Sequence, residues 1–360
     1  MKMIFPLLVG LILILSFKSR DDLYQVITAH PHDVNDLKPF IDTVHQSGRL
    51  WVVRLRKNAP HRVYQFLKIV SGDEKSFIPQ LDAKTHIDSR QDHAVRIFID
   101  SVDKDNIRKD VENLSGYKTR VSGSKENQLA VLSVLSRLKS FGYDVRELCH
   151  AQNLCNIIAE KKGNLHPEEV IMIMAHIDSV GGAFAGADDN ASGTAVLIEM
   201  AKVLKDYSNK KTIRFYVSNS EEQGLIGSSY YARLLAAENG LKNLSLVINM
   251  DMVGYNSDGL VELETDPGFK NLATWYAGVA AQFTQLKTKI TLGAWGSDHV
   301  PFLKRGVPSI LTIENWETKT PCYHASCDTP STLNYDYAAE IGRLNLAAVI
   351  LKDQAKAFSF

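Results

Sequence analysis

The sequence predicts an α/β fold in which a mostly parallel central sheet is covered by helices on both faces. The composition is that of a globular protein, with 45% hydrophobic and 23% charged residues. From about residue 104, short and uninterrupted apolar runs alternate with segments of helical periodicity. Because such runs lack the in-and-out alternation of a half-exposed strand, they are typical of parallel strands buried on both sides.

Four apolar runs are the predicted central strands, at residues 170–175, 213–218, 246–250 and 309–313. Apolar residues at helical spacing predict helices over 197–204 and 341–351. No internal repeat or low-complexity tract divides this part of the chain. We therefore expect a single domain over residues 101–360.

Residues 19–100 are predicted to form a small α/β unit in front of that domain. Strands are indicated at Leu50–Leu55, at residues 63–70 and at Val95–Ile99, whereas Val34, Leu37, Ile41 and Val44 have helical spacing. The polar stretch over residues 82–93 is interpreted as an exposed linker, where processing would occur.

The N-terminus is typical of a secretory signal peptide. Lys2 precedes an apolar run from Met3 to Phe17, which is short for a membrane-spanning helix but suits the core of a signal. We predict a signal peptide over residues 1–18, a secreted or periplasmic protein, and no stable membrane partner after cleavage. Because no clear cleavage site follows, an uncleaved anchor and a buried segment are the alternatives.

The charge balance gives no sign of a nucleic-acid partner. Lys plus Arg and Asp plus Glu both count 41, so the chain has no excess of basic residues.

Four cysteines form two close pairs, Cys149 with Cys155 and Cys322 with Cys327. This pattern favours disulfides in an oxidising compartment, although three connectivities are formally open and four reduced, buried thiols are the alternative.

Polar side chains follow three of the predicted strands at the point where each strand ends. His176 and Asp178 follow the first strand, Glu221 and Glu222 the second, and Asp251 the third. In an open parallel sheet, ligands bind outside the carboxyl ends of the strands. We therefore expect these residues to meet at one edge.

Such a cluster predicts a metal centre. Asp189 lies in G-A-D-D-N-A-S-G, just ahead of a predicted helix, and His324 is the best candidate for a second histidine. Buried carboxylates repel one another unless cations compensate, and these oxygen and nitrogen donors suit zinc. Any one of these residues alone would more often be a surface carboxylate or a buried histidine whose nitrogens are hydrogen-bonded. Six of them at strand ends make that interpretation unfavourable.

Six ordered motifs in this sequence resemble the co-catalytic dinuclear-zinc aminopeptidases, a family that includes secreted bacterial leucyl aminopeptidases. The resemblance covers about residues 104–357. The motifs are A-H-I-D-S (175–179), G-A-D-D-N-A-S-G (186–193), S-E-E-Q-G-L-I-G-S (220–228), N-M-D-M-V-G-Y (249–255), S-D-H-V-P-F (297–302) and Y-H-A-S-C-D-T (323–329).

The resemblance implies two Zn²⁺ ions and a role for each matching residue. Asp189 would bridge the two ions, a choice over Asp188 that rests on the motif alone. The remaining ligands would be His176 and Asp251 for one ion and Glu222 and His324 for the other.

Two further carboxylates receive catalytic roles from the same resemblance. Glu221 would be the general base, and Asp178 would orient the ring of His176. Ser297, Asp298 and His299 of S-D-H are interpreted as residues that support the site or fix a loop, and the resemblance implies that His299 is not a metal ligand.

The resemblance further implies removal of N-terminal residues from peptides or proteins. Separately, we expect the protein to be a monomer. Met252, Ile313 and Trp316 are the candidates for an apolar pocket that holds a leucine-like first side chain, with ordinary core packing as the alternative. Residues 19–100 would be a propeptide or an accessory domain, and 101–360 the catalytic domain.

Other functions occur on the same fold. Glutaminyl cyclases share most of these motifs but use one zinc, and typically carry tryptophan where Tyr323 precedes His324. Carboxypeptidases and dipeptidases of the dinuclear type use similar ligands. A non-enzymatic binding module is the least favoured alternative, because such relatives lose metal ligands and this chain keeps them.

Overall fold

The structure is a computed structural model that describes residues 23–27, 41–47, 50–56, 68–70, 89–182, 184–294 and 296–355. The predicted signal peptide at 1–18 lies outside these residues. Among the residues described, no helix is both long and apolar enough to cross a membrane.

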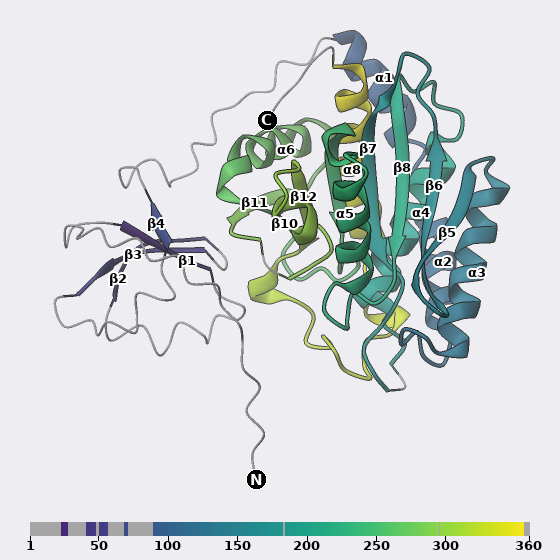
Figure 1. The fold of residues 1–360 in the computed structure, drawn as a ribbon, viewed down its shortest axis with the longest axis horizontal. Coiled ribbons are helices and arrows are strands. Elements are labelled where there is room, and N and C mark those ends of the chain that lie inside the picture. Colours follow the sequence, from purple (N-terminus) through teal and green to yellow (C-terminus); the bar gives the residue numbers. More distant parts are fainter. Residues whose placement is uncertain are drawn as a thin grey trace.

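An eight-stranded sheet forms the centre of the larger part of the chain (Figure 1). Its strand order is β11-β10-β12-β9-β7-β8-β6-β5, and the four neighbours β12, β9, β7 and β8 run parallel. These four are the predicted central strands, so the α/β fold is confirmed. The strands are β5 (Asp144–Ala151), β6 (Leu154–Lys161), β7 (His166–His176), β8 (Lys211–Ser218), β9 (Leu244–Met250), β10 (Leu260–Thr265), β11 (Lys287–Leu292) and β12 (Ser309–Glu314).

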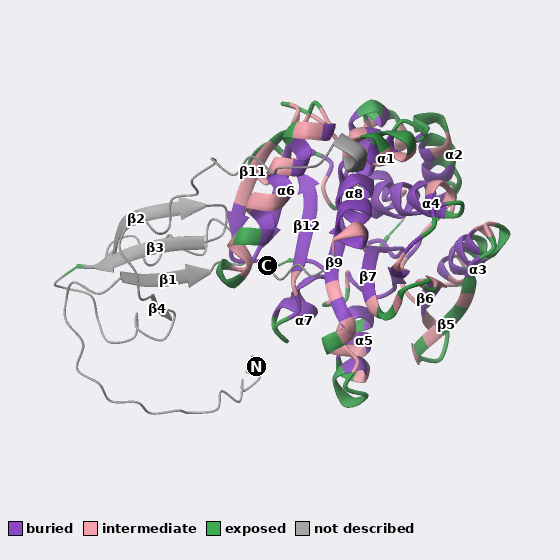
Figure 2. Cartoon of the chain, turned by 90° about the horizontal axis from the view of Figure 1, so that it is seen from above, coloured by how far each residue is buried: buried purple, intermediate pink, exposed green. Residues whose placement is uncertain are grey.

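Helices cover both faces of this sheet (Figure 2). Ile171 and Ile173 of β7 belong to an apolar cluster with most of the helices, whereas Met172 and Met174 pack with α5 and α7 on the other face. Both predicted helices are confirmed, within α4 and α8. The helices are α1 (Ser89–Ile99), α2 (Lys104–Ser115), α3 (Lys125–Ser140), α4 (Gly193–Leu204), α5 (Ile226–Ala237), α6 (Lys270–Phe283), α7 (Val300–Leu303) and α8 (Tyr335–Gln354).

The four strands near the N-terminus form a separate antiparallel sheet of order β2-β3-β1-β4. They are β1 (Leu23–Ile27), β2 (Ile41–Ser47), β3 (Leu50–Leu55) and β4 (Lys68–Val70). The strand predicted at Leu50–Leu55 is confirmed, and β4 lies within the predicted 63–70. The helix predicted from Ile41 and Val44 is wrong, because both residues lie in strand β2, where Ile41 pairs with Leu55 of β3; Val34 and Leu37 lie outside the described residues.

The strand predicted at Val95–Ile99 is also wrong, because these residues end helix α1. A short apolar run fits a strand or one turn of a buried helix, and here Val95 and Ile99, one helical turn apart, are buried in the core of the large domain. Helix α1 packs against α8. The large domain therefore begins before residue 100, and residues 89–93 are helical rather than linker.

Replacing Ile99 by alanine should destabilise the large domain by about 2–5 kcal/mol, because it leaves a cavity in a packed core. Ile97→Ala is the matched control in the same helix, since Ile97 is 55% exposed. It should change the free energy of unfolding by no more than about 0.5 kcal/mol. Urea unfolding of the full chain measures both, and equal effects would contradict the placement of α1 in the core.

Candidate metal centre

The site lies at the carboxyl edge of the parallel strands. His176 is the last residue of β7, Glu221 and Glu222 follow the end of β8, and Asp251 follows β9. Because β8, β7 and β9 are neighbours and parallel, their ends deliver these side chains to the same place. The expected convergence at one edge is observed.

Two groups of possible metal ligands meet at Asp189. His176 Nε2 lies 3.4 Å from Asp189 Oδ1 and 3.2 Å from Asp251 Oδ1. His324 Nε2 lies 3.1 Å from Asp189 Oδ2 and 3.3 Å from Glu222 Oε2. Each group offers three ligand atoms within 4.8 Å of one another. The five residues predicted as ligands are therefore together, and Asp189 presents one oxygen to each histidine.

The donor set fits zinc. Imidazole nitrogens and carboxylate oxygens are ligands that zinc accepts, and the second oxygen of Glu222, Oε1, is buried without a hydrogen-bond partner. Burial alone would raise the pKa of Asp189, but hydrogen bonds from His176 and His324 lower it. The charged carboxylate of Asp189 is thus favoured, as metal ligation requires.

The structure separates Asp189 from its neighbour Asp188. Asp188 Oδ1 accepts hydrogen bonds from the backbone N–H groups of Gly254 at 2.8 Å and Tyr255 at 3.2 Å. It also lies 3.3 Å from the Ser192 hydroxyl. Asp188 is therefore used to hold the segment after β9, whereas Asp189 faces the two histidines.

Asp178 holds the backbone that carries the two glutamates. Its two carboxylate oxygens accept hydrogen bonds from the N–H groups of Glu221 and Glu222, each at 3.1 Å. Its carboxylate is 3.7 Å from Nδ1 of His176, while its main-chain oxygen is closer to that nitrogen, at 3.2 Å. Asp178 thus contacts the ring of His176 and also fixes the Glu221–Glu222 turn.

The carboxyl of Glu221 is suited to carry a proton. Glu221 is buried, and burial raises its pKa well above the ordinary value; His176 opposes the shift, and Asp251 adds to it. A buried carboxyl with a raised pKa beside the candidate ligands is a group that can hold and release a proton.

Two further polar residues support Asp251. Asn249 donates from Nδ2 to the Ser297 hydroxyl at 2.8 Å, and that hydroxyl donates to Asp251 Oδ2 at 2.6 Å. The S-D-H motif thus contributes a supporting residue, as the sequence indicates. His299 is fully buried, 3.7 Å from Glu264. Asn249 was not recognised from the sequence, because its place at the end of β9 is equally typical of core packing.

An apolar cluster lies beside the candidate ligands. Met252 and Ile313 pack together with Leu311, and Trp316 and Tyr323 lie against them. The Tyr323 ring stacks on His324, with ring centroids 3.8 Å apart, and Trp316 meets Tyr323 edge-on. The three predicted pocket residues are thus brought together, whereas Leu311 and Tyr323 were not predicted to join them.

The four cysteines pair as neighbours, Cys149 with Cys155 and Cys322 with Cys327. The second disulfide closes the short loop that contains His324, whose φ is 53°. It therefore restricts the segment that carries one of the candidate ligands.

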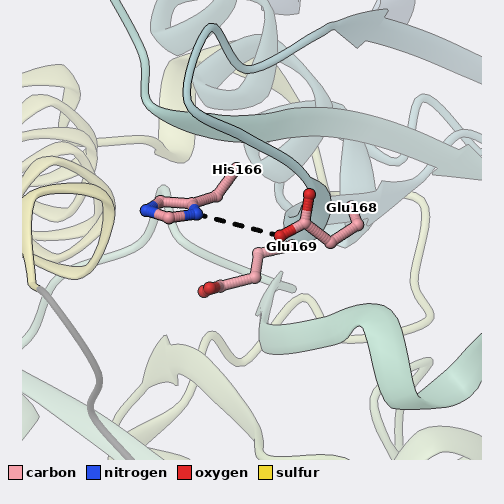
Figure 3. A group of neighbouring side chains, drawn as sticks. All are labelled: His166, Glu168 and Glu169. Atoms are coloured by element: carbon pink, nitrogen blue, oxygen red, sulfur yellow. Dashed lines mark ion pairs between the residues drawn. The ribbon is translucent and has the colours of Figure 1, made fainter.

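Another group with metal-ligand chemistry lies at the start of β7 (Figure 3). There, His166 Nδ1 is 3.8 Å from Glu168, and the Glu169 carboxylate is 3.7 Å from Lys211 Nζ. Because the side chains of His166 and Glu168 are 39% and 65% exposed and Glu169 already has a cation beside it, this group is a solvated surface cluster at the far end of the strand.

The profile of Peptidase family M28 matches residues 156–349, which contain every candidate ligand. The chain belongs to this family.

Similar proteins include aminopeptidase YwaD of Bacillus subtilis, which is 33% identical over 248 residues. That match covers 66% of this chain and 52% of YwaD, so the chain spans about half the length of this relative. The solved structure of LapB from Legionella pneumophila has a TM-score of 0.69 at 20% identity and covers 93% of this chain and 100% of its own. A zinc aminopeptidase from Bacillus subtilis gives 0.64 at 21% identity, over 71% of this chain and 97% of its own.

Asp189→Asn should weaken zinc binding at least about 100-fold, because both candidate ligand groups lose a charged oxygen. Asp188→Asn is the matched neighbour, and it should bind zinc nearly as tightly as the wild type, since an amide oxygen still accepts the N–H groups of Gly254 and Tyr255. Competition against a zinc-binding dye measures both affinities. Equal losses in the two variants would contradict the assignment of Asp189.

Proposed function

We propose that this chain is a zinc aminopeptidase that removes apolar N-terminal residues from peptides with the help of two Zn²⁺ ions. The observation that carries the proposal is the pair of ligand groups that share Asp189. One ion would be held by His176 and Asp251, the other by Glu222 and His324, with Asp189 between them. Membership of Peptidase family M28 and the likeness to an aminopeptidase support it.

Zinc in such a site supplies a Lewis acid that polarises the scissile carbonyl and lowers the pKa of water. The chain's own residues supply the proton transfers. Glu221 takes a proton from the attacking water and then gives it to the leaving amine. Asp178 keeps Glu221 in place through the backbone N–H, so that the base meets the substrate at a fixed position.

The apolar cluster supplies the pocket for the first side chain. Met252 directly follows the proposed ligand Asp251, and Tyr323 stacks on His324, so the cluster adjoins one proposed ligand of each ion. With Ile313 and Trp316 it offers a surface without charged groups of its own, which favours a leucine-like residue. Leu311 and Tyr323 extend the pocket predicted from the sequence.

We propose further that the protein is secreted or periplasmic and acts as a monomer. Two disulfides and the apolar segment at residues 1–18 support export. The separate sheet within residues 19–100 supports a propeptide or accessory role for that segment. Because α1 packs in the large domain, a proteolytic cleavage that leaves the catalytic domain intact falls before residue 89.

Purified, zinc-loaded protein should hydrolyse leucine-p-nitroanilide, and chelation should abolish the activity. Glu221→Gln should lower kcat about 10²- to 10⁴-fold, because it removes the proton carrier while leaving the proposed ligands. Zinc content should stay at the wild-type level. Glu168→Gln is the control, since the Glu168 side chain is 65% exposed and lies at the start of β7, at the opposite end from His176, and it should keep full activity.

Two controls identify the reaction. N-acetylated leucine-p-nitroanilide should not be cleaved, because an aminopeptidase requires a free N-terminus. Cyclisation of an N-terminal glutamine, or release of a C-terminal residue, in place of leucine release would contradict the proposal and favour the cyclase or carboxypeptidase activities of the same fold.

The pocket is tested by Ile313→Ala, which removes apolar contact with the first side chain. We expect kcat/KM for a leucine substrate to fall at least about 10-fold relative to an alanine substrate. Ile310→Ala is the matched control, because Ile310 lies in the same strand but packs on the opposite face of the sheet. An equal loss of selectivity in both variants would show that Ile313 does not line the pocket.

A further inference from the structure

The loop that carries Asp189 lies between a buried cation and a buried anion. Arg120 precedes α3 and is fully buried, and Asp328 follows His324 by four residues and is 3% exposed. Neither residue is among the proposed zinc ligands. Both contact the segment from Ala185 to Asp189.

Arg120 holds this loop through its carbonyl groups. Its guanidinium donates to the main-chain oxygens of Ala185 and Gly186, the latter at 2.7 Å. The same side chain donates to the carbonyl of Ile177, directly after the proposed ligand His176, at 2.8 Å. Arg120 thus joins the end of β7 to the loop that leads to Asp189.

The guanidinium keeps its charge in this position. Burial lowers the pKa of Arg120 to about 10, with Asp328, Asp178 and Asp189 opposing the shift, so the side chain is a cation at neutral pH. A buried cation is costly unless its donors are bonded and anions lie near it, and here both conditions are met.

Asp328 holds the same loop through its N–H groups. Its Oδ1 accepts from the backbone N–H of Asp188 at 2.8 Å, and its Oδ2 accepts from that of Asp189 at 3.1 Å. Asp328 directly follows Cys327, whose disulfide to Cys322 closes the loop that contains His324. Asp328 therefore connects the loop of the proposed ligand His324 to the loop of the proposed ligand Asp189.

The space between these partners is tight at Gly186. Its φ is 56°, and a Cβ there would lie 2.6 Å from the carbonyl oxygen of Asp189 and 3.0 Å from Arg120 Nη2. The backbone therefore approaches the guanidinium more closely than a larger residue permits.

We propose that Arg120 and Asp328 are positioning residues that fix Asp189 between the two histidines and thereby set the affinity of both proposed zinc ions together. Arg120 binds the carbonyl groups of the loop, and Asp328 binds the backbone N–H groups of the same loop. The carboxylate of Asp189 is therefore held in place before a metal ion binds. This inference rests on the proposed metal centre. The inference predicts an effect on both ions rather than on one, because Asp189 belongs to both ligand groups.

The test is zinc binding to Asp328→Asn, measured by calorimetric titration of metal-free full-length protein. Removing one charged acceptor should weaken both binding events about 10- to 100-fold, as loss of a supporting carboxylate commonly does. Arg120→Lys is the second variant; it keeps the charge but cannot reach all the carbonyls, and should weaken both events as well.

The chain offers a matched control in Asp353. This carboxylate is also fully buried and also accepts from two consecutive backbone N–H groups, those of Lys210 and Lys211, but at the opposite end of β8. Asp353→Asn should lower the melting temperature to a similar degree and leave zinc affinity unchanged.

Two results would overturn the inference. One is wild-type affinity for zinc in Asp328→Asn, and the other is a loss at only one of the two binding events. If Asp328→Asn does not fold, the test uses Arg120→Lys and measures how far added zinc raises its melting temperature. A rise equal to that of the wild type would overturn the inference. Wild-type protein that binds no zinc would overturn the metal centre itself, which is a distinguishable failure.

Discussion

Mutual repulsion among buried carboxylates is the constraint on which the rest of this site depends. Four carboxylates (Asp189, Glu221, Glu222 and Asp251) and two histidines meet at one sheet edge, and most of these side chains are buried. Such a group is stable when cations or hydrogen-bond donors face its oxygens, or when some of the carboxyls hold a proton. Three of these carboxylates, Asp189, Glu222 and Asp251, are the proposed ligands. Glu221 lies beside them, in a group with His176 and Glu222.

Two other acidic groups of the region have both carboxylate oxygens bonded to backbone N–H groups. Asp178 accepts the N–H groups of Glu221 and Glu222, and Asp328 those of Asp188 and Asp189. Each of these carboxylates therefore positions residues of the site through consecutive main-chain donors. The parallel sheet makes this possible, because neighbouring strands end together and their following turns lie within reach of one another.

The sequence predicts the centre of the fold well and its margins poorly, for physical reasons. The strands at 170–175 and 246–250 are mostly apolar runs that are buried on both faces, and they alternate along the chain with segments of helical periodicity. Val95–Ile99 and Ile41–Val44 are short segments in which helical and strand periodicities fit equally, and tertiary packing decides between them. The family motifs favour Asp189 as the shared ligand. The contacts that give Asp188 and Asp189 different roles come from residues far along the chain.

Arg120 and Asp328 show what spacing alone does not reveal. Asp328 lies about 140 residues from the N–H groups it accepts, and Arg120 lies 66 residues from Gly186. Their roles depend on how loops meet after folding, so no local pattern identifies them.

The most direct test of the central claim is the number of zinc ions that the full-length, metal-free chain binds, measured by calorimetric titration with elemental analysis of the loaded protein. A two-ion centre that shares Asp189 predicts two zinc ions per chain, with Asp189→Asn losing both. A single bound ion in the wild type, or two ions that persist in Asp189→Asn, would contradict this account.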